Sequence, residues 1–218
     1  MESFHPTSEL LDISLPISTG MPTWPGDPFP TLEPVTTVER HGVRVSRLVL
    51  STHTGTHLDA PSHFIAGGKT VDQLDLEALV GPCCLIDVLH EGGPLSRAVL
   101  QRFDLQPGAR VLLKTGNSLR GIGAGFDSGF VALTSEAGEY LCERRVRLVG
   151  IDGPSVDPWG SADFPCHKRL LGANILILEN LVLRHVEPGV YHLVAAPLNL
   201  RGADGCPVRA FLTRLPVP

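Results

Sequence analysis

The sequence contains no apolar run long enough to span a bilayer, and its first residues place no basic region ahead of an apolar one. We therefore expect neither a transmembrane helix nor a secretory signal peptide. Lysine and arginine number 18 against 23 aspartates and glutamates and form no cluster, which argues against nucleic acid or an anionic membrane as the main partner. The 5 cysteines include no C-x-x-C pair, and their odd number is typical of free thiols in a reducing cytoplasm.

Several catalytic and nucleotide-binding signatures are also missing. No G-x-S-x-G elbow occurs, which argues against a serine hydrolase of that type. Gly68-Lys69-Thr70 matches the end of a Walker A motif, but His63 stands where the motif needs its first glycine. The glycines from Gly121 to Gly125 lack the G-x-G-x-x-G spacing of dinucleotide-binding turns. We expect both glycine-containing segments to be flexible loops.

The composition and the apolar segments together predict an α/β fold. The chain has 218 residues, enough for one sizeable domain or two small ones, and its 23 glycines and 19 prolines favour many turns and strands. Candidate strands cover residues 10–17, 43–50, 83–88, 110–114, 130–133, 146–152, 175–178 and 190–196. Short helices are predicted at 74–80, 96–103 and 134–144. With no internal repeat and no clear linker, we expect a single domain over residues 1–218, with a mixed, strand-rich sheet and few helices.

A proline-rich arm is predicted near the N-terminus, at about residues 16–34. Its prolines exclude a helix and restrict each preceding residue to extended conformations. The arm carries Trp24, for which two interpretations stand side by side. The indole is either an aromatic packed in a surface loop or part of the wall of a substrate pocket.

The strongest chemical signal is the histidine-rich stretch at residues 51–64. His53, His57, Asp59 and His63 all occupy odd-numbered positions, so an extended chain would tend to point them the same way. The H-E-x-x-H pattern of helical metalloproteases is absent, and the residues between the histidines are poor helix formers. Imidazole and carboxylate groups are the ligands that divalent metals such as zinc accept. We therefore expect a metal site on a strand or on the turn that leaves it.

Less specific readings of these residues remain open. The histidines and Asp59 could pair among themselves, although an uncompensated buried carboxylate is costly. Farther along the chain, His167 alone could be an exposed histidine, and Glu179 ends an apolar run where an ionised side chain needs a partner. A metal ion would provide that partner, and so would an arginine such as Arg184.

The histidine-rich stretch also carries a family resemblance. H-T-G-T-H-L-D-A-P-S-H, at residues 53–63, is similar to the H-x-G-T-H-x-D-x-P-x-H signature of the metal-dependent cyclase-like hydrolases. That family includes the bacterial kynurenine formamidases and the isatin hydrolases. Similarity to the formamidases extends over nearly the whole chain, through D-I-S at 12–14, W-P-G-D at 24–27, G-I-D at 150–152, S-V-D at 155–157, L-E-N-L at 178–181 and A-P-L at 196–198.

The resemblance implies roles for particular residues. It assigns one metal ion to His53, His57 and Asp59, and a second ion to Asp59, His167 and Glu179. It implies that His63 is the catalytic acid/base and that Trp24 lies at the substrate pocket. Two zinc ions per subunit are expected, with manganese or another divalent ion possible because such sites share ligand types.

The implied activity is hydrolysis of the formamide of N-formyl-L-kynurenine, a small-molecule substrate, to L-kynurenine and formate in tryptophan degradation. A homodimer and a cytoplasmic location are expected as well. A hydrolase of isatin or another small cyclic amide is an alternative with the same ligands. A metal-storage or metal-sensing module is an alternative of another class, but it would need neither a fourth histidine beside the site nor an aromatic pocket wall.

Overall fold

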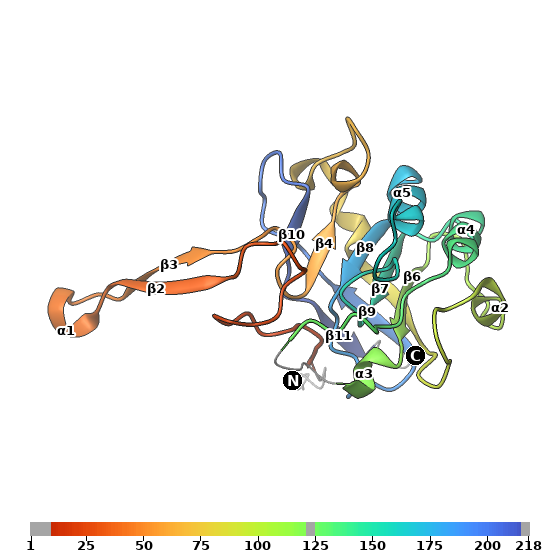
Figure 1. Ribbon diagram of the computed structural model, residues 1–218, viewed down its shortest axis with the longest axis horizontal. Coiled ribbons are helices and arrows are strands. Elements are labelled where there is room, and N and C mark those ends of the chain that lie inside the picture. Colours follow the sequence, from red (N-terminus) through yellow and green to blue (C-terminus); the bar gives the residue numbers. More distant parts are fainter. Residues whose placement is uncertain (1–9, 121–124, 215–218) are drawn as a thin grey trace, which may run out of the picture.

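A computed structural model describes residues 10–120 and 125–214, and a nine-stranded mixed sheet forms the centre of this part of the chain (Figure 1). The spatial order is β1 (Leu10–Asp12), β11 (Phe211–Arg214), β9 (Gly189–Val194), β5 (Val80–Asp87), β6 (Arg110–Lys114), β7 (Leu148–Ile151), β8 (Leu176–Glu179), β4 (His57–Asp59) and β10 (Gly205–Pro207). Strands β5 to β8 run parallel, and the flanking strands pair antiparallel. The expected α/β class with a mixed, strand-rich sheet is confirmed.

Three helices cover one face of the parallel strands: α2 (Arg97–Leu100), α4 (Ser135–Glu143) and α5 (Pro165–Gly172) (Figure 1). Their apolar side chains share one core with the strands, and Val149 and Ile177 of the sheet belong to it. Residues of β6 and β7 are buried throughout, because both faces of these strands are covered. Below we call this face of the sheet the helix side.

The opposite face encloses a second core built mainly by strands. Leu58 of β4, Leu112 of β6 and Leu212 of β11 lie in the same buried cluster, although their strands are far apart in the sheet order. The sheet must therefore curl for its two ends to share one core. The alternate residues of β4 and β8 that face this second core are apolar, so these two strands can carry polar residues only on the helix side.

A second, two-stranded sheet projects away from this body as a hairpin (Figure 1). It consists of β2 (Thr31–Thr36), the short helix α1 (Val38–His41) and β3 (Val45–Val49), and all of β3 is exposed. The predicted arm is irregular only as far as Pro30, because Thr31 onward pairs with β3.

Several predicted elements occur as expected, and others do not. Strand β6 has the predicted bounds, and Thr134 caps α4 by accepting a hydrogen bond from the Ala137 amide. The strand predicted at 130–133 is wrong, because this segment forms only a single bridge, between Leu133 and Leu95. Helix α5 and strands β2, β10 and β11 were not predicted.

The predicted helix at 74–80 is one 3-10 turn, η3 (Leu76–Ala78), which follows η1 (Pro61–His63) and η2 (Val71–Gln73). Helix α3 (Asn117–Arg120) precedes the glycine loop, of which residues 121–124 lie outside the described part. Among the described helices, none has the length and hydropathy that a membrane crossing requires.

Candidate metal centre and active site

The pairing of β4 with β8 creates the centre of the site. His57 lies opposite Glu179, and Asp59 lies opposite Ile177. Directly paired residues of antiparallel strands share a face, and Ile177 belongs to the helix-side core. The side chains of His57, Asp59 and Glu179 therefore point to the helix side, while Leu58 between them packs into the opposite core.

Helix α5 brings His167 to the same place. Its Nε2 lies 3.1 Å from Glu179 Oε1 and 3.4 Å from Asp59 Oδ2. The buried carboxylate of Asp157 accepts the amide hydrogens of Cys166 and His167, and its Oδ2 lies 2.7 Å from His167 Nδ1. Asp157 thus anchors the first turn of the helix and orients the ring. The exposed-histidine interpretation of His167 is wrong, because only 3% of the residue is exposed.

His57 is held in a matching way from its own strand. Its Nδ1 lies 2.8 Å from the carbonyl oxygen of Gly55, a pure acceptor, so Nδ1 carries the hydrogen. Its Nε2 lies 3.4 Å from both Asp59 Oδ1 and Glu179 Oε2. Both buried histidines therefore turn Nε2 toward the two carboxylates, with the other ring nitrogen fixed by an acceptor outside the cluster.

His53 and His63 reach the site by turns rather than by strand alternation. The strand covers only 57–59, His53 lies in the preceding turn, and His63 ends the 3-10 turn η1. The expectation that period-two alternation aligns all four residues thus holds only within β4. His53 Nδ1 nevertheless lies 2.9 Å from Asp59 Oδ1, and the rings of His53 and His63 stack with centroids 4.0 Å apart.

The charges of this cluster call for cations. Burial opposes ionisation of Asp59, yet the nearby imidazoles of His167 and His53 hold its pKa well below the usual range. Burial also opposes protonation of His53, but Asp59 and Asp204 outweigh it and raise its pKa to about 9. The site therefore concentrates negative charge and attracts positive charge despite being buried.

The donor set fits divalent metal ions. Within the described residues, His53, His57 and Asp59 offer ligand atoms within 4.8 Å of one another, and so do Asp59, His167 and Glu179. Asp59 belongs to both groups, and its Oδ2 makes no hydrogen bond with any described residue although it is buried. A buried carboxylate oxygen without a hydrogen bond is costly unless a cation neutralises it. Arg184 does not pair with Glu179; this carboxylate lies close to His57 and His167 and accepts a hydrogen bond from the Val156 amide.

Cys166 does not contribute to these groups, although it precedes His167. Its Sγ faces the carbonyl oxygens of Leu133 and Thr134 and packs against Gly138 of α4. Burial raises the pKa of this thiol, which keeps it protonated and makes it a poor metal ligand.

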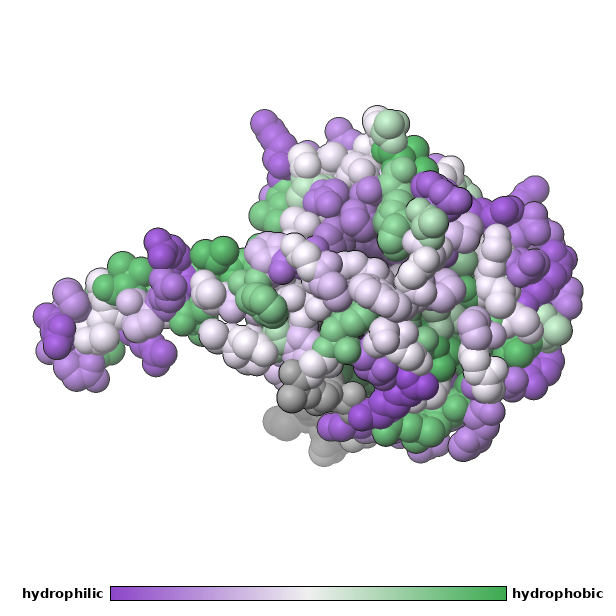
Figure 2. Space-filling model, viewed as in Figure 1, coloured by the Kyte–Doolittle hydropathy of each residue, from purple (hydrophilic) through white to green (hydrophobic). Residues whose placement is uncertain are grey.

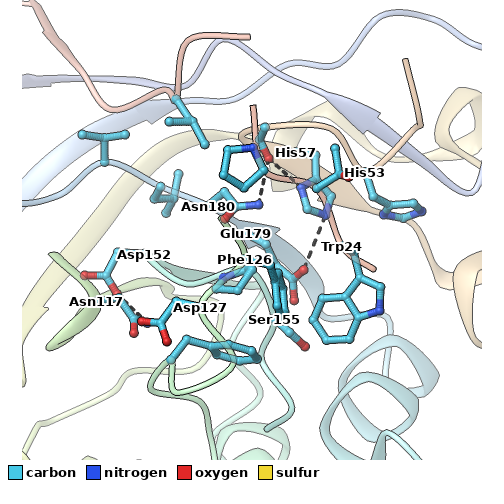
Figure 3. Close-up of a pocket in the computed structure, with 18 of the residues that line it drawn as sticks. Trp24, His53, His57, Asn117, Phe126, Asp127, Asp152, Ser155, Glu179 and Asn180 are labelled. Atoms are coloured by element: carbon cyan, nitrogen blue, oxygen red, sulfur yellow. Dashed lines mark hydrogen bonds and ion pairs between the residues drawn. The ribbon is translucent and has the colours of Figure 1, made fainter. Parts of the chain in front are cut away.

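The cluster opens into a cavity of about 420 Å³. His53, His57 and Glu179 lie together at one end with Trp24 beside them, and Asn117 and Asp152 lie farther along (Figure 3). Trp24 packs with Phe126, Phe130 and Trp159, at ring centroid distances of 5.2, 6.3 and 5.2 Å. Of the two interpretations of Trp24, the geometry favours the pocket wall, because the indole lines the cavity.

Two carboxylates near the histidines were missed by the sequence reasoning. Asp157 stood within the recognised S-V-D segment, but nothing in its neighbours indicated that it contacts His167. Asp204 lies in the turn before β10, with its Oδ2 3.1 Å from His53 Nε2. No local pattern marks Asp204, since an aspartate followed by a glycine is ordinary in a turn.

Comparison with known proteins shows the relatives of this chain. The Cyclase family model ("Putative cyclase") matches residues 11–158. Over 207 residues, 94% of this chain and 98% of the relative, the sequence is 42% identical to the kynurenine formamidase of Bacillus thuringiensis subsp. konkukian (strain 97-27). A solved structure from Bacillus stearothermophilus, described as a "predicted metal-dependent hydrolase", is similar with a TM-score of 0.85, 36% identity and coverage of 96% of this chain and 100% of that one. Isatin hydrolase A from Labrenzia aggregata is more distant, at 25% identity, a TM-score of 0.84 and coverage of 95% and 94%.

The fold, the ligand groups and these similarities define an enzyme of the metal-dependent amidohydrolase class. The chain belongs to the Cyclase family.

Proposed function

We propose that the protein hydrolyses N-formyl-L-kynurenine to L-kynurenine and formate, in tryptophan degradation. The observation that carries the proposal is the pair of ligand groups sharing Asp59, placed at one end of an aromatic-walled cavity that His63 also lines. The 42% identity to kynurenine formamidases over nearly the whole chain supports this substrate above other amides. The cavity, at about 420 Å³, has the size of a small-molecule site.

The ligand assignment is also part of the proposal. His53, His57 and Asp59 would hold one ion, and Asp59, His167 and Glu179 a second. We infer zinc, since tetrahedral sites of imidazole and carboxylate suit it, although manganese binds similar ligands. Such ions lower the pKa of bound water to about 7 and polarise carbonyl oxygens.

Residues of the chain would transfer the proton and bind the aryl ring. His63 lines the pocket, and burial lowers its pKa, which favours the neutral imidazole that can act as a base. It takes a proton from the attacking water and returns it to the aniline nitrogen as the formyl C–N bond breaks. The water oxygen stays on the formyl carbon, which leaves as formate. Trp24 and Phe126 line the part of the cavity where the aryl ring would pack.

The first test is turnover of N-formyl-L-kynurenine by metal-loaded protein, followed at the absorbance of kynurenine. Isatin is assayed in parallel, because an isatin hydrolase is among the structural neighbours. We expect the formamide to be the better substrate. A preference for isatin would overturn the proposed substrate, but the protein would still be a metal-dependent amidohydrolase. Tight metal uptake without turnover of either amide would favour a metal-binding module instead. Elemental analysis of the same sample identifies the metal and counts ions per chain.

We also infer a homodimer, from the exposed hairpin. Its two strands carry apolar side chains in solvent, including Val35 at 61% and Leu48 at 56% exposure, seen as green patches along the projection in Figure 2. An isolated two-stranded hairpin is marginally stable in water, so a second copy of the chain is expected to cover it. Light scattering should give a dimer mass, and Leu48→Asp should shift it toward the monomer. All 5 cysteines are free thiols, which fits a reducing cytoplasm.

A further inference from the structure

Asp204 is held firmly beside the histidine-rich stretch by contacts that do not involve its catalytic neighbours. The Ala60 amide donates to the Asp204 carbonyl oxygen at 2.9 Å, and the Thr52 hydroxyl donates to Asp204 Oδ1 at 3.1 Å. The next residue, Gly205, has no room for a side chain, because a Cβ there would lie 2.6 Å from the His53 ring. The turn is therefore built to bring Asp204 close to His53.

The second carboxylate oxygen of Asp204 faces two imidazoles at once. Oδ2 lies 3.1 Å from His53 Nε2 and 3.4 Å from His63 Nδ1. The two rings stack on each other, inclined by 29°. The opposite nitrogen of His53, Nδ1, faces Asp59. One oxygen atom thus lies next to both a proposed metal ligand and the proposed acid/base.

We propose that Asp204 is a positioning residue for the hydrolysis, which accepts hydrogen bonds from His53 Nε2 and His63 Nδ1. In this arrangement His53 keeps the lone pair of Nδ1 for the metal, and His63 keeps Nε2 for proton transfer in the cavity. A carboxylate that takes one N–H of an imidazole fixes its tautomer and ring orientation and makes the other nitrogen more basic. The proposal deepens the proposed function and rests on it.

The exposure of Asp204 suits this role. Its side chain is 44% exposed, unlike Asp59 at 1%. Exposed ion pairs contribute little to folding stability. A large loss of activity on substitution, with unchanged stability, would therefore indicate positioning rather than folding.

The test compares Asp204→Ala and Asp204→Asn with wild type on N-formyl-L-kynurenine at saturating zinc. We expect kcat to fall about 10- to 100-fold in the alanine variant and less in the asparagine variant, whose amide oxygen still accepts. KM and the midpoint of thermal unfolding should stay near wild type. Asp72→Ala is the matched control, because Asp72 accepts a hydrogen bond from Gly202 in the same loop and touches none of the histidines.

Two readouts are independent of turnover. Competition with a chelator measures zinc retention, which should weaken in both Asp204 variants if His53 loses its partner. Nitrogen NMR of 15N-histidine-labelled, zinc-loaded protein reports the tautomer of His63, assigned by comparison with His63→Gln. We expect hydrogen on Nδ1 in wild type and a mixture of tautomers in Asp204→Ala.

The possible results lead to different conclusions about Asp204. Wild-type kcat, zinc retention and tautomer in Asp204→Ala would overturn the proposal. Weakened zinc retention with wild-type kcat at saturating zinc would overturn the part of the proposal that concerns His63. An equal loss of kcat in Asp72→Ala would assign the effect to the loop. If wild type fails to hydrolyse N-formyl-L-kynurenine, the proposed substrate fails, whereas the zinc and NMR measurements still test Asp204.

Discussion

Two groups of histidines and carboxylates share one cavity, and they differ in burial. The buried group consists of Asp59, His167 and Glu179, and the half-exposed group consists of His53, His63 and Asp204. Side chains of the first are between 1% and 5% exposed, and those of the second between 14% and 44%. The buried group could hold a cation, because its carboxylate oxygens are buried and need a positive partner. The half-exposed group can exchange protons with water and substrate. The half-exposed group thus combines a proposed metal ligand, His53, with the proposed acid/base, His63, whereas the buried group contains proposed metal ligands alone.

The same contrast appears in how the two groups are built. Strand pairing and the first turn of α5 place the buried group, and each of its residues lies in a regular element. Turns place the half-exposed group, from the chain before β4, from η1 and from the chain before β10. Regular elements give precise positions for ligands, whereas turns at the rim leave the cavity open to substrate.

The largest expected effect comes from breaking the buried group with Asp59→Ala. Both proposed ions lose a ligand, so we expect elemental analysis to find only trace metal. Turnover should fall by about 10⁴-fold or more, since the ions supply much of the catalytic power. Asp104→Ala serves as the control, because the Asp104 side chain is 84% exposed and its ion-pair partner is Arg144, which is not a residue of the site. Metal at the wild-type level in Asp59→Ala would show that Asp59 is not a ligand shared by two ions.

The next effect comes from the half-exposed group, with His63→Ala. Loss of a general acid/base typically costs about 10²- to 10⁴-fold in rate, and we expect kcat to fall within that range. Metal content should stay at the wild-type level, which separates this variant from Asp59→Ala. The exposed His90 provides the control substitution. Wild-type turnover by His63→Ala would show that the proton passes through another group.

A smaller effect is expected from the outer contacts of the buried group, with Asp157→Asn. The amide keeps the shape of the side chain but weakens its hydrogen bond to His167 Nδ1. Changes of this kind typically cost about 10- to 100-fold in metal affinity or activity. Zinc titration of the apoprotein measures the loss. Should affinity stay unchanged, the helix rather than the carboxylate orients the ring.

The smallest effect concerns the pocket wall beyond both groups, with Trp24→Leu. Aromatic pairs contribute about 0.5–1.5 kcal/mol beyond the area that they bury, which predicts a roughly two- to tenfold rise in KM with little change in kcat. Trp159→Leu is the matched variant, because Trp159 packs against Trp24 and is 45% exposed. An equal or larger rise for Trp159→Leu would mean that Trp24 acts only by packing.

Local sequence patterns predicted some elements well and others poorly. The continuous apolar run of β6 and the Thr134 cap of α4 are short-range signals that tertiary contacts reinforce. Helix α5 escaped prediction because its N-cap residue, Phe164, has no capping side chain, and the Asp157 carboxylate accepts the amide hydrogens of its first turn instead. The hairpin strands were partly read as an irregular arm, since prolines masked their pairing.

The sequence by itself determined the chemistry of this protein. The spacing of His53, His57, Asp59 and His63 indicated a metal site, because such residues rarely gather by chance. Only the tertiary structure decided which distant side chains meet at this stretch. Strand pairing brought Glu179 beside His57, α5 carried His167 inward, and the turn before β10 placed Asp204 between two imidazoles. These contacts join residues far apart in the chain, so no local pattern could specify them.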